Sequence, residues 1–341
     1  MSSADFHPDN TAAEHICCTR MSGPGDGGWG VRYSMDSSYP SPAPSAGGEA
    51  IVSEVMLQNK RDPEARTVSI STAFNPVTHP TGLDLIFSSL DCVLFYVDMK
   101  VIAKASPRAF QSAISASSTH EPPGVMNIIL IQETSPVLNV MLHTLYRTSC
   151  ARHSPTFETL VDAVNHMPLY DISPAAHIIP SSHIYATLVA YAPLYPLELY
   201  GLAGQHQIHE LAVATSSHLL SYPLPSMSDE IAQRMGALYL KRLFDLHLNR
   251  FSALNEMLHS PPHLHAPTIK CTSADQRSLR RAWVLVSAYL AWETRADLST
   301  HGIKLAFGPS IERLSCQLCR GSLEAKVHEI VVKWASVKST I

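Results

Sequence analysis

The residues best suited to chemistry lie in the last quarter of the chain. Cys316 and Cys319 form a CxxC pair, and this spacing lets two thiolates bind one tetrahedral zinc ion. Cys271 together with His263 or His265 can supply the two remaining ligands. His265 is the better choice because it lies nearer to Cys271 in the sequence. The pattern therefore makes Cys271, Cys316, Cys319 and His265 candidates for a metal site.

Two other interpretations of the CxxC pair stay open. Positions i and i+3 share one face of a helix, where Cys316 and Cys319 can pack as small buried hydrophobic side chains. The pair can also be redox active. Because one CxxC pair alone does not define a metal site, packing is the interpretation that the sequence favours. From the sequence we therefore predict no cofactor and assign no metal site.

Motifs of known enzyme classes are missing from the sequence. GxSxG, SxxK and the P-loop pattern GxxxxGK[ST] do not occur, and these motifs carry nucleophilic and phosphate chemistry. Gly23, Gly25 and Gly28 form a GxGxxG, yet neither a strand pattern before it nor a helix pattern after it supports a dinucleotide site. His206 and His209 are spaced i, i+3, whereas zincins need i, i+4, so a solvated helix face is expected there. The chain is predicted not to be an enzyme.

Charge and composition restrict the class of partner. The 341 residues include 25 Lys and Arg against 29 Asp and Glu, a formal net charge of −4. Such a chain has no excess positive charge to neutralise a phosphate backbone. Arg277, Arg280 and Arg281 share one helix face, which we interpret as a solvated face. With only 16% charged residues, much of the surface is neutral or apolar, so we predict protein partners and no nucleic acid.

The compartment is predicted from cysteine usage and apolar windows. Seven cysteines are an odd number and far too few for a disulfide scaffold, and no basic stretch followed by an apolar run opens the chain. The most apolar windows, 283–292 and 125–131, are shorter than the ~20 residues that a membrane-spanning helix needs. We expect an intracellular protein, cytoplasmic or nuclear, without membrane contact.

The first half of the chain is predicted to contain an N-terminal tail followed by a small sheet. Residues 1–50 hold 7 Gly, 5 Pro and 8 Ser and show no apolar periodicity, so residues 1–80 are expected to be disordered or weakly ordered. Strands are expected over 84–90 and 93–97, joined as a hairpin, and over 127–133. Helices are expected over 101–113, with Pro107 opening a second helix, from a Ser135 cap with Pro136 at N1 through residue 145, and over 156–167.

The second half is predicted to be helical. Apolar periodicity indicates helices over 197–220, 228–258 and 278–292, a short helix opened by Pro309 that carries Cys316 and Cys319, and a docked terminal helix from residue 323. The expected fold class is α+β, a three-stranded sheet covered by helices and followed by an all-α region. The expected domains are 81–170 and 171–341, after the segment 1–80.

Several of these segments resemble one family. Residues 84–106 resemble the opening of a BTB/POZ domain, in which an Asp-led hairpin runs into a helix that ends in Ala-x-x-Ser, with Phe110 in the place of the following Phe. Residues 127–133 resemble its third strand, and residues 142–146 its helix ending in Leu-Tyr. The resemblance covers roughly residues 82–170, in particular to the BTB proteins expanded in mushroom-forming fungi, and residues 196–203 resemble the helical segment that follows in those proteins.

This resemblance implies an adaptor that binds other proteins through the BTB surface, as homodimer, heterodimer or scaffold of a cullin ubiquitin ligase. Where the family usually has a His before the helix, this chain has Asp98. In dimeric members that His and the leading Asp, here Asp84, contribute to a partly buried charged pocket. Asp84, Asp98 and Lys100 are therefore the candidate interaction residues. Alternative functions are a substrate receptor of a cullin-3 ligase, and a zinc-binding enzyme or regulator built on Cys271, Cys316 and Cys319.

Overall fold

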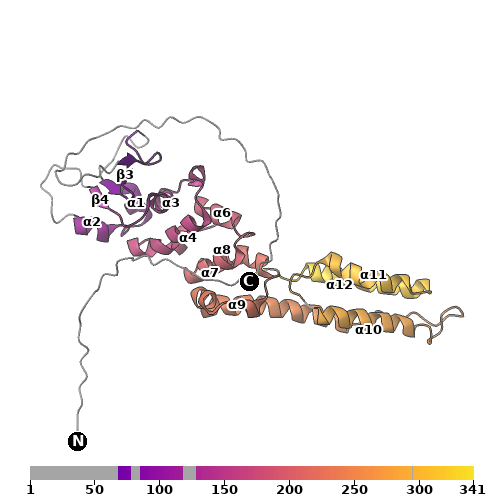
Figure 1. Cartoon of the computed structure of the whole chain (residues 1–341). Coiled ribbons are helices and arrows are strands. Elements are labelled where there is room, and N and C mark those ends of the chain that lie inside the picture. The colour runs from indigo at the N-terminus through magenta and orange to yellow at the C-terminus, as the bar shows by residue number, and fades with distance from the viewer. Residues whose placement is uncertain (1–67, 78–84, 118–127, 294) are drawn as a thin grey trace, which may run out of the picture. The chain divides into compact units, whose positions relative to one another are not determined.

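A mixed four-stranded sheet opens the described part of the chain (Figure 1). The structure is a computed structural model and describes residues 68–77, 85–117, 128–293 and 295–341. The strand order is β1-β3-β2-β4, in which β2 and β3 are antiparallel while β1 and β4 run parallel to their neighbours. The strands are β1 (Ser69–Ile70), β2 (Leu85–Ser88), β3 (Val93–Val97) and β4 (Ile128–Leu130).

The predicted hairpin is the centre of this sheet. Aromatic and β-branched side chains favour both strands, and Cys92 takes a left-handed conformation in the turn with φ 61°. The Ser89 hydroxyl accepts a hydrogen bond of 3.1 Å from the backbone N–H of Val93. The Asp91 carboxylate accepts bonds of 2.8 and 2.6 Å from the backbone N–H and hydroxyl of Ser135. The turn is thereby tied to the first residue of the next long helix.

Helices pack against the sheet and continue its core. Asp98 caps the first helix by accepting a 2.8 Å bond from the backbone N–H of Lys100, and Thr156 caps the fourth. Phe87, Phe95 and Leu138 are each at most 1% exposed and lie in one hydrophobic cluster. The helices are α1 (Met99–Ala105), α2 (Gln111–Ser117), α3 (Ser135–Tyr146) and α4 (Phe157–His166).

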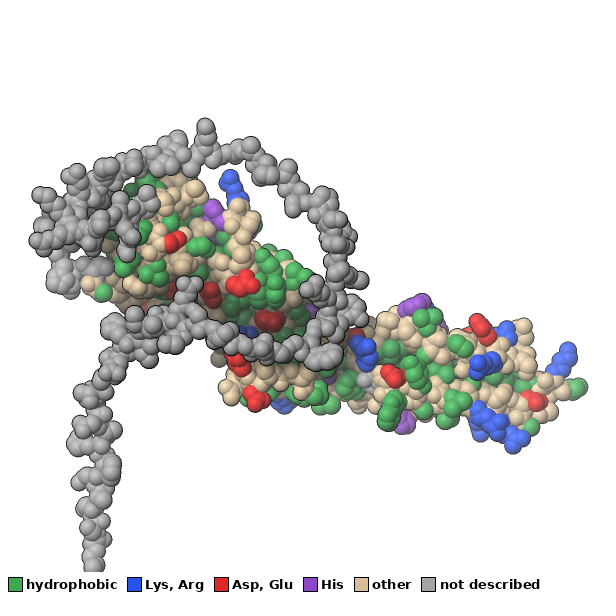
Figure 2. Space-filling model, viewed as in Figure 1, with side chains coloured by type: hydrophobic (Ala, Val, Ile, Leu, Met, Phe, Trp, Pro, Cys, Tyr) green, Lys and Arg blue, Asp and Glu red, His purple; other side chains and the backbone are tan. Residues whose placement is uncertain are grey.

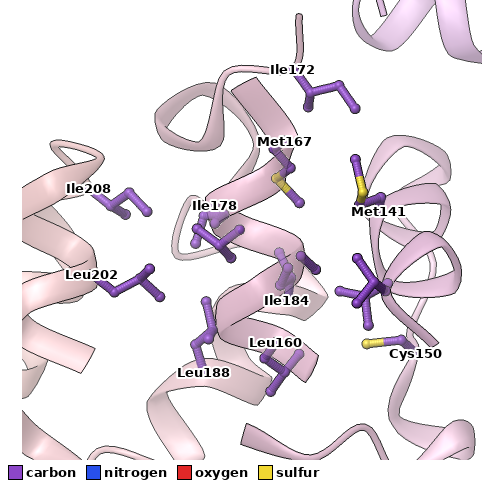
Figure 3. Packing of buried hydrophobic residues seen from close by; sticks show 14 of the residues in the cluster. Met141, Cys150, Leu160, Met167, Ile172, Ile178, Ile184, Leu188, Leu202 and Ile208 are labelled. Atoms are coloured by element: carbon purple, nitrogen blue, oxygen red, sulfur yellow. The ribbon is translucent and has the colours of Figure 1, made fainter. Parts of the chain in front are cut away.

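The same cluster extends through the following short helices, on both sides of residue 170. Figure 3 shows Met141 of α3 and Leu160 of α4 in one packed group with Met167, Ile184 and Leu188 from the segments that follow. This region contains α5 (Pro174–His177), α6 (His183–Ala190), α7 (Pro196–Gln205), α8 (His209–Ser216) and the 3-10 turns Ala151–His153, Met167–Tyr170, Ser217–Leu219 and Leu224–Ser226.

One long helix, α9 (Asp229–His259), packs on α7 and continues beyond it. Its N-cap is Ser228, the first residue of the helix predicted over 228–258, and it is kinked at Gly236, whose φ of 74° and ψ of 160° suit glycine alone. The approach is close at Gly204 of α7, where an added Cβ would lie 2.5 Å from the carbonyl oxygen of Met235. Glycine is therefore required at both positions for α7 and α9 to pack as they do.

The last part of the chain is a bundle of α9 with α10 (Arg277–Trp292), α11 (Thr300–Glu312) and α12 (Gln317–Ala335), which lie side by side in Figure 1. The bundle has a second hydrophobic cluster, in which the rings of Trp283 and Phe307 stack on each other. Arg250 of α9 is 6% exposed and donates to the carbonyl oxygens of Ala296 (2.6 Å) and Val337 (3.1 Å). Its guanidinium thus fastens one end of the bundle.

The α+β class predicted from the sequence is confirmed, and the structure differs from the expected elements in the following details. A fourth strand, β1, adds to the expected three and lies in the segment expected to be weakly ordered. Pro309 lies inside α11 instead of opening a helix, and Cys316 and Cys319 belong to the start of α12. The expected helix over 197–220 is two helices, because Gln207 has a φ of 57°. α2 begins four residues after Pro107, and Thr134 instead of Ser135 is the N-cap of α3.

Candidate metal centre

Four side chains that are distant in the sequence converge at one end of the bundle. The sulfurs of Cys271, Cys316 and Cys319 and a ring nitrogen of His265 all lie within 4.8 Å of one another. The Cys271 and Cys319 sulfurs are 3.8 Å apart. His265 Nε2 is 3.4 Å from the Cys316 sulfur and 3.3 Å from the Cys319 sulfur. All four metal candidates of the sequence are therefore brought together.

The three pair distances of 3.8, 3.4 and 3.3 Å are close to those of a tetrahedral zinc site. With Zn–S bonds of about 2.3 Å and a Zn–N bond of about 2.0 Å, tetrahedral angles place two sulfurs about 3.8 Å apart and a sulfur and nitrogen about 3.5 Å apart. Three cysteines and one histidine form one of the ligand sets found in structural zinc sites. Among the residues that the structure describes, no other group of three or more His, Cys, Asp or Glu side chains is arranged in this way.

Two connections of the bundle carry the ligands. His265 and Cys271 lie between α9 and α10, where Thr268 and Cys271 exchange backbone hydrogen bonds of 2.9 and 3.1 Å in a tight turn. Cys316 is the N-cap residue of α12, and Cys319 lies in the first turn of that helix. Because the helices run up and down the bundle, the α9–α10 and α11–α12 connections meet at the same end.

The orientation of His265 suits a metal ligand. Its Nδ1 lies 2.7 Å from the carbonyl oxygen of Ala266, so Nδ1 carries the proton and donates it, and the lone pair of Nε2 faces the cysteines. Metal-binding histidines are commonly fixed by a hydrogen bond of this kind. The side chain of Gln276, only 3% exposed, donates a 2.9 Å bond to the carbonyl oxygen of His265. One hydrogen bond thus fixes the ring of His265, and a second fixes its backbone.

The three thiols differ in their electrostatic surroundings. The backbone N–H of Cys319 donates to the Cys316 sulfur at the start of α12 and lowers the thiol pKa of Cys316 to about 7. Burial instead raises the pKa of the Cys271 and Cys319 thiols, and both side chains are 1% exposed. A divalent cation reverses that preference, because it stabilises the thiolate directly. The centre is thus suited to binding a cation with loss of thiol protons.

Other candidate residues of the sequence are placed elsewhere. Asp98 caps α1, and Lys100 is an exposed residue of that helix, while Asp84 lies outside the described residues, as do Gly23, Gly25 and Gly28. The carbonyl oxygen of His263 accepts a hydrogen bond from Ser322, and its ring is not among the ligands. His206 and His209 form separate pairs, with Asn165 and Arg242 respectively.

Gln276 is the residue of this site that the sequence does not indicate. It lies between Cys271 and α10 in a segment without apolar periodicity, and nothing in its spacing relates it to His265. Its role depends on the fold of the connection, which brings its amide to the His265 carbonyl.

Comparisons with family models, curated proteins and solved structures found no match to this chain. The described helices include none with the length and apolar character to cross a membrane.

Proposed function

We propose that this chain is a non-enzymatic adaptor that binds other proteins, and that its helical bundle is held together by one structural zinc ion. The observation that carries the proposal is the convergence of three cysteine sulfurs and one histidine nitrogen within 4.8 Å. When bound, zinc joins the α9–α10 connection to the start of α12. The geometry thus favours the metal interpretation of Cys271, Cys316 and Cys319 over the packing of isolated thiols.

The ligand number favours a structural role over a catalytic one. Catalytic zinc sites keep one position for water or substrate beside three protein ligands, whereas structural sites are closed by four. Here the protein supplies four ligands, and two of the cysteines are 1% exposed. A zinc-dependent enzyme at this centre is therefore the less favoured alternative.

The adaptor part of the proposal is supported by the order of elements in the first part of the chain. Strand, strand, helix pair, strand, helix and helix is the order that underlies the BTB/POZ resemblance, and β2, β3, α1, α2, β4, α3 and α4 follow it. The helix ending in Leu-Tyr is present as the end of α3, where the Tyr146 hydroxyl accepts a 2.7 Å bond from the backbone N–H of Asp98.

Metal analysis of the purified full chain tests the zinc part. We expect about one zinc per chain, released when a mercurial reagent modifies the thiols. Cys319→Ser is expected to lose the metal, and Cys150→Ser, which replaces a buried free cysteine outside the centre, is expected to keep it. Zinc well below stoichiometry after growth in zinc-supplemented medium, or equal zinc in both variants, contradicts the proposal.

Light scattering after size exclusion tests the adaptor part. Asp98 stands beside a second acid in the pocket that the resemblance implies, so Asp98→His replaces a like charge. We expect this variant to shift the mass of the full chain toward that of a dimer. A mass that stays unchanged at every protein concentration contradicts the implied interface.

A further inference from the structure

We propose that a groove beside the metal centre binds an acidic, amphipathic peptide segment of a partner protein. This inference rests on the proposed adaptor function and names the class of partner for the bundle. The groove has a volume of about 580 Å³ and lies between the first residues of the α9–α10 connection, directly after α9, and α10. The residues that give it its character are Pro261, Pro262, Leu264, Arg280, Trp283 and Val284.

The walls of the groove are apolar and partly open to solvent. Leu264 is 38% exposed and Val284 is 61% exposed, and Pro261 lies beside them on the surface. Exposed apolar side chains that line a concave surface mark a place where an apolar group can be buried. The groove therefore fits apolar side chains of a short segment.

The rim of the groove is positively charged. Arg280 lines it, and Arg277 and Arg281 are exposed within one turn of Arg280 on α10. Within the described part of the chain, none of these three arginines forms an ion pair with an acidic side chain. Arg277 interacts electrostatically with the carboxylate of Asp275, so the charge available to a ligand is mainly that of Arg280 and Arg281.

This end of the bundle differs in charge from the whole chain. Residues 260–281 and 312–320 contain six Lys and Arg but two Asp and Glu, while the full sequence has a net charge of −4. Figure 2 shows blue side chains gathered at the end of the bundle beyond α10. A ligand that combines carboxylates with apolar side chains complements both the rim and the groove.

The groove fits a peptide better than a nucleic acid. Trp283 is 3% exposed, and its ring stacks on Phe307 with centroids 5.3 Å apart. It therefore offers no free face on which a base can stack. The apolar contacts come from Pro261, Leu264 and Val284, which can bury an aliphatic or aromatic side chain but do not read bases.

Zinc has an indirect role in this site. The wall formed by residues 261–264 leads directly into the ligand His265. Fixing His265 to the start of α12 also fixes this wall against α10, so an ordered groove follows from a bound metal.

Peptide display on the zinc-loaded full chain tests the inference. We expect random short peptides selected by the protein to be enriched in Asp and Glu flanking Leu, Phe or Trp. A selected peptide, carrying a fluorophore, is then titrated by fluorescence anisotropy. Arg280→Glu and Val284→Glu are each expected to weaken its binding about tenfold or more.

Two matched variants control for charge and exposure. Lys304→Glu makes the same change of charge as Arg280→Glu on an exposed position of α11, and Leu305, 62% exposed, matches Val284, 61% exposed. We expect Lys304→Glu and Leu305→Glu to bind the peptide like the original chain. Selected peptides without an excess of acids, or equal binding by the groove and control variants, overturn the inference.

Two further results separate the possible failures. A short DNA duplex or single-stranded RNA that binds more tightly than the peptide, and depends on Arg280 but not on Val284, overturns the inference in favour of nucleic acid. Stoichiometric zinc without any enriched peptide overturns the groove but leaves the zinc proposal intact. Peptide binding that depends on the groove residues in a chain that contains no zinc overturns the zinc proposal but leaves the groove intact.

Discussion

Removal of one metal ligand should destabilise the bundle selectively, and Cys319→Ser is the sharpest form of this change. Cys319 and Cys271 are separated by 48 positions in the chain, and folding brings them together, so the binding free energy of the metal stabilises the folded bundle. A ligand that binds only the folded chain, at a free concentration about 1,000 times its Kd, stabilises it by about 4 kcal/mol. Because the bundle is the size of a small domain, this corresponds to a fall in its melting temperature of roughly 15–30 °C.

Tryptophan fluorescence is the appropriate assay. Three of the four tryptophans in the sequence, Trp283, Trp292 and Trp334, lie in α10 and α12, so their emission follows the bundle. We expect the zinc-loaded chain to show a late transition that moves to lower temperature in Cys319→Ser or after treatment with a chelator. Once both proteins are metal-free, they should melt close together, because only the small packing difference between Cys and Ser remains.

The matched control is Cys150→Ser. Cys150 is 2% exposed and belongs to the hydrophobic cluster of the first part of the chain. We expect this variant to leave the tryptophan transition in place even if it lowers the stability of its own cluster. A zinc-loaded Cys319→Ser variant that melts with the original chain would refute the assignment of a structural metal.

Three other predictions concern the rest of the fold. Gly204→Ala should lower the unfolding free energy by about 1–3 kcal/mol in urea denaturation, because the new methyl group meets the Met235 carbonyl oxygen. Arg250→Met should lower it by about 3 kcal/mol, since it removes charged hydrogen bonds to three carbonyl oxygens. Burial, with a smaller contribution from His153, lowers the pKa of His143 to about 4 from 6.5. Stability should therefore fall as the pH drops from 6.5 toward 4, and His143→Asn should reduce the slope of urea stability against pH in that window.

Each of these predictions has a result that contradicts it. For the two stability variants it is an unfolding free energy equal to that of the original chain. Gly308→Ala serves as the control for Gly204→Ala, because a Cβ there meets nothing within 4 Å. For His143, the folded state prefers the neutral imidazole, so the unfolded chain takes up a proton at a higher pH than the folded chain does. Stability therefore falls as the pH drops. An unchanged slope in His143→Asn contradicts that assignment.

The sequence predicts the small elements better than the long-range arrangement. The hairpin of β2 and β3 and the helix expected from Ser228 follow from local chemistry, and the structure has them. Pro309 reads as a helix start because proline suits that position. It lies inside α11 because Ile303 and Phe307, both 0% exposed, fix the preceding turns of that helix in the bundle core.

The candidate site could be predicted only in part, because it depends on the long-range arrangement of the helices. A CxxC pair is visible in the sequence, but the packing of two buried cysteines and a zinc site share that pattern. What distinguishes them is the antiparallel course of the bundle, which brings His265 and Cys271 to the start of α12. No local pattern contains that information, and the role of Gln276 depends on it as well.

The part of α9 that follows the kink at Gly236 joins the two hydrophobic clusters. Tyr239 and Leu243 belong to the first cluster, and Leu254 and Leu258 to the second. Fraying that starts at the C-terminal end of α9, where the connection to the metal ligands begins, is opposed by Leu254 and Leu258, and further back by the packing of α9 on α7. The middle turns of this helix are therefore the place where a disturbance of one cluster reaches the other, and slow amide exchange there should report on both.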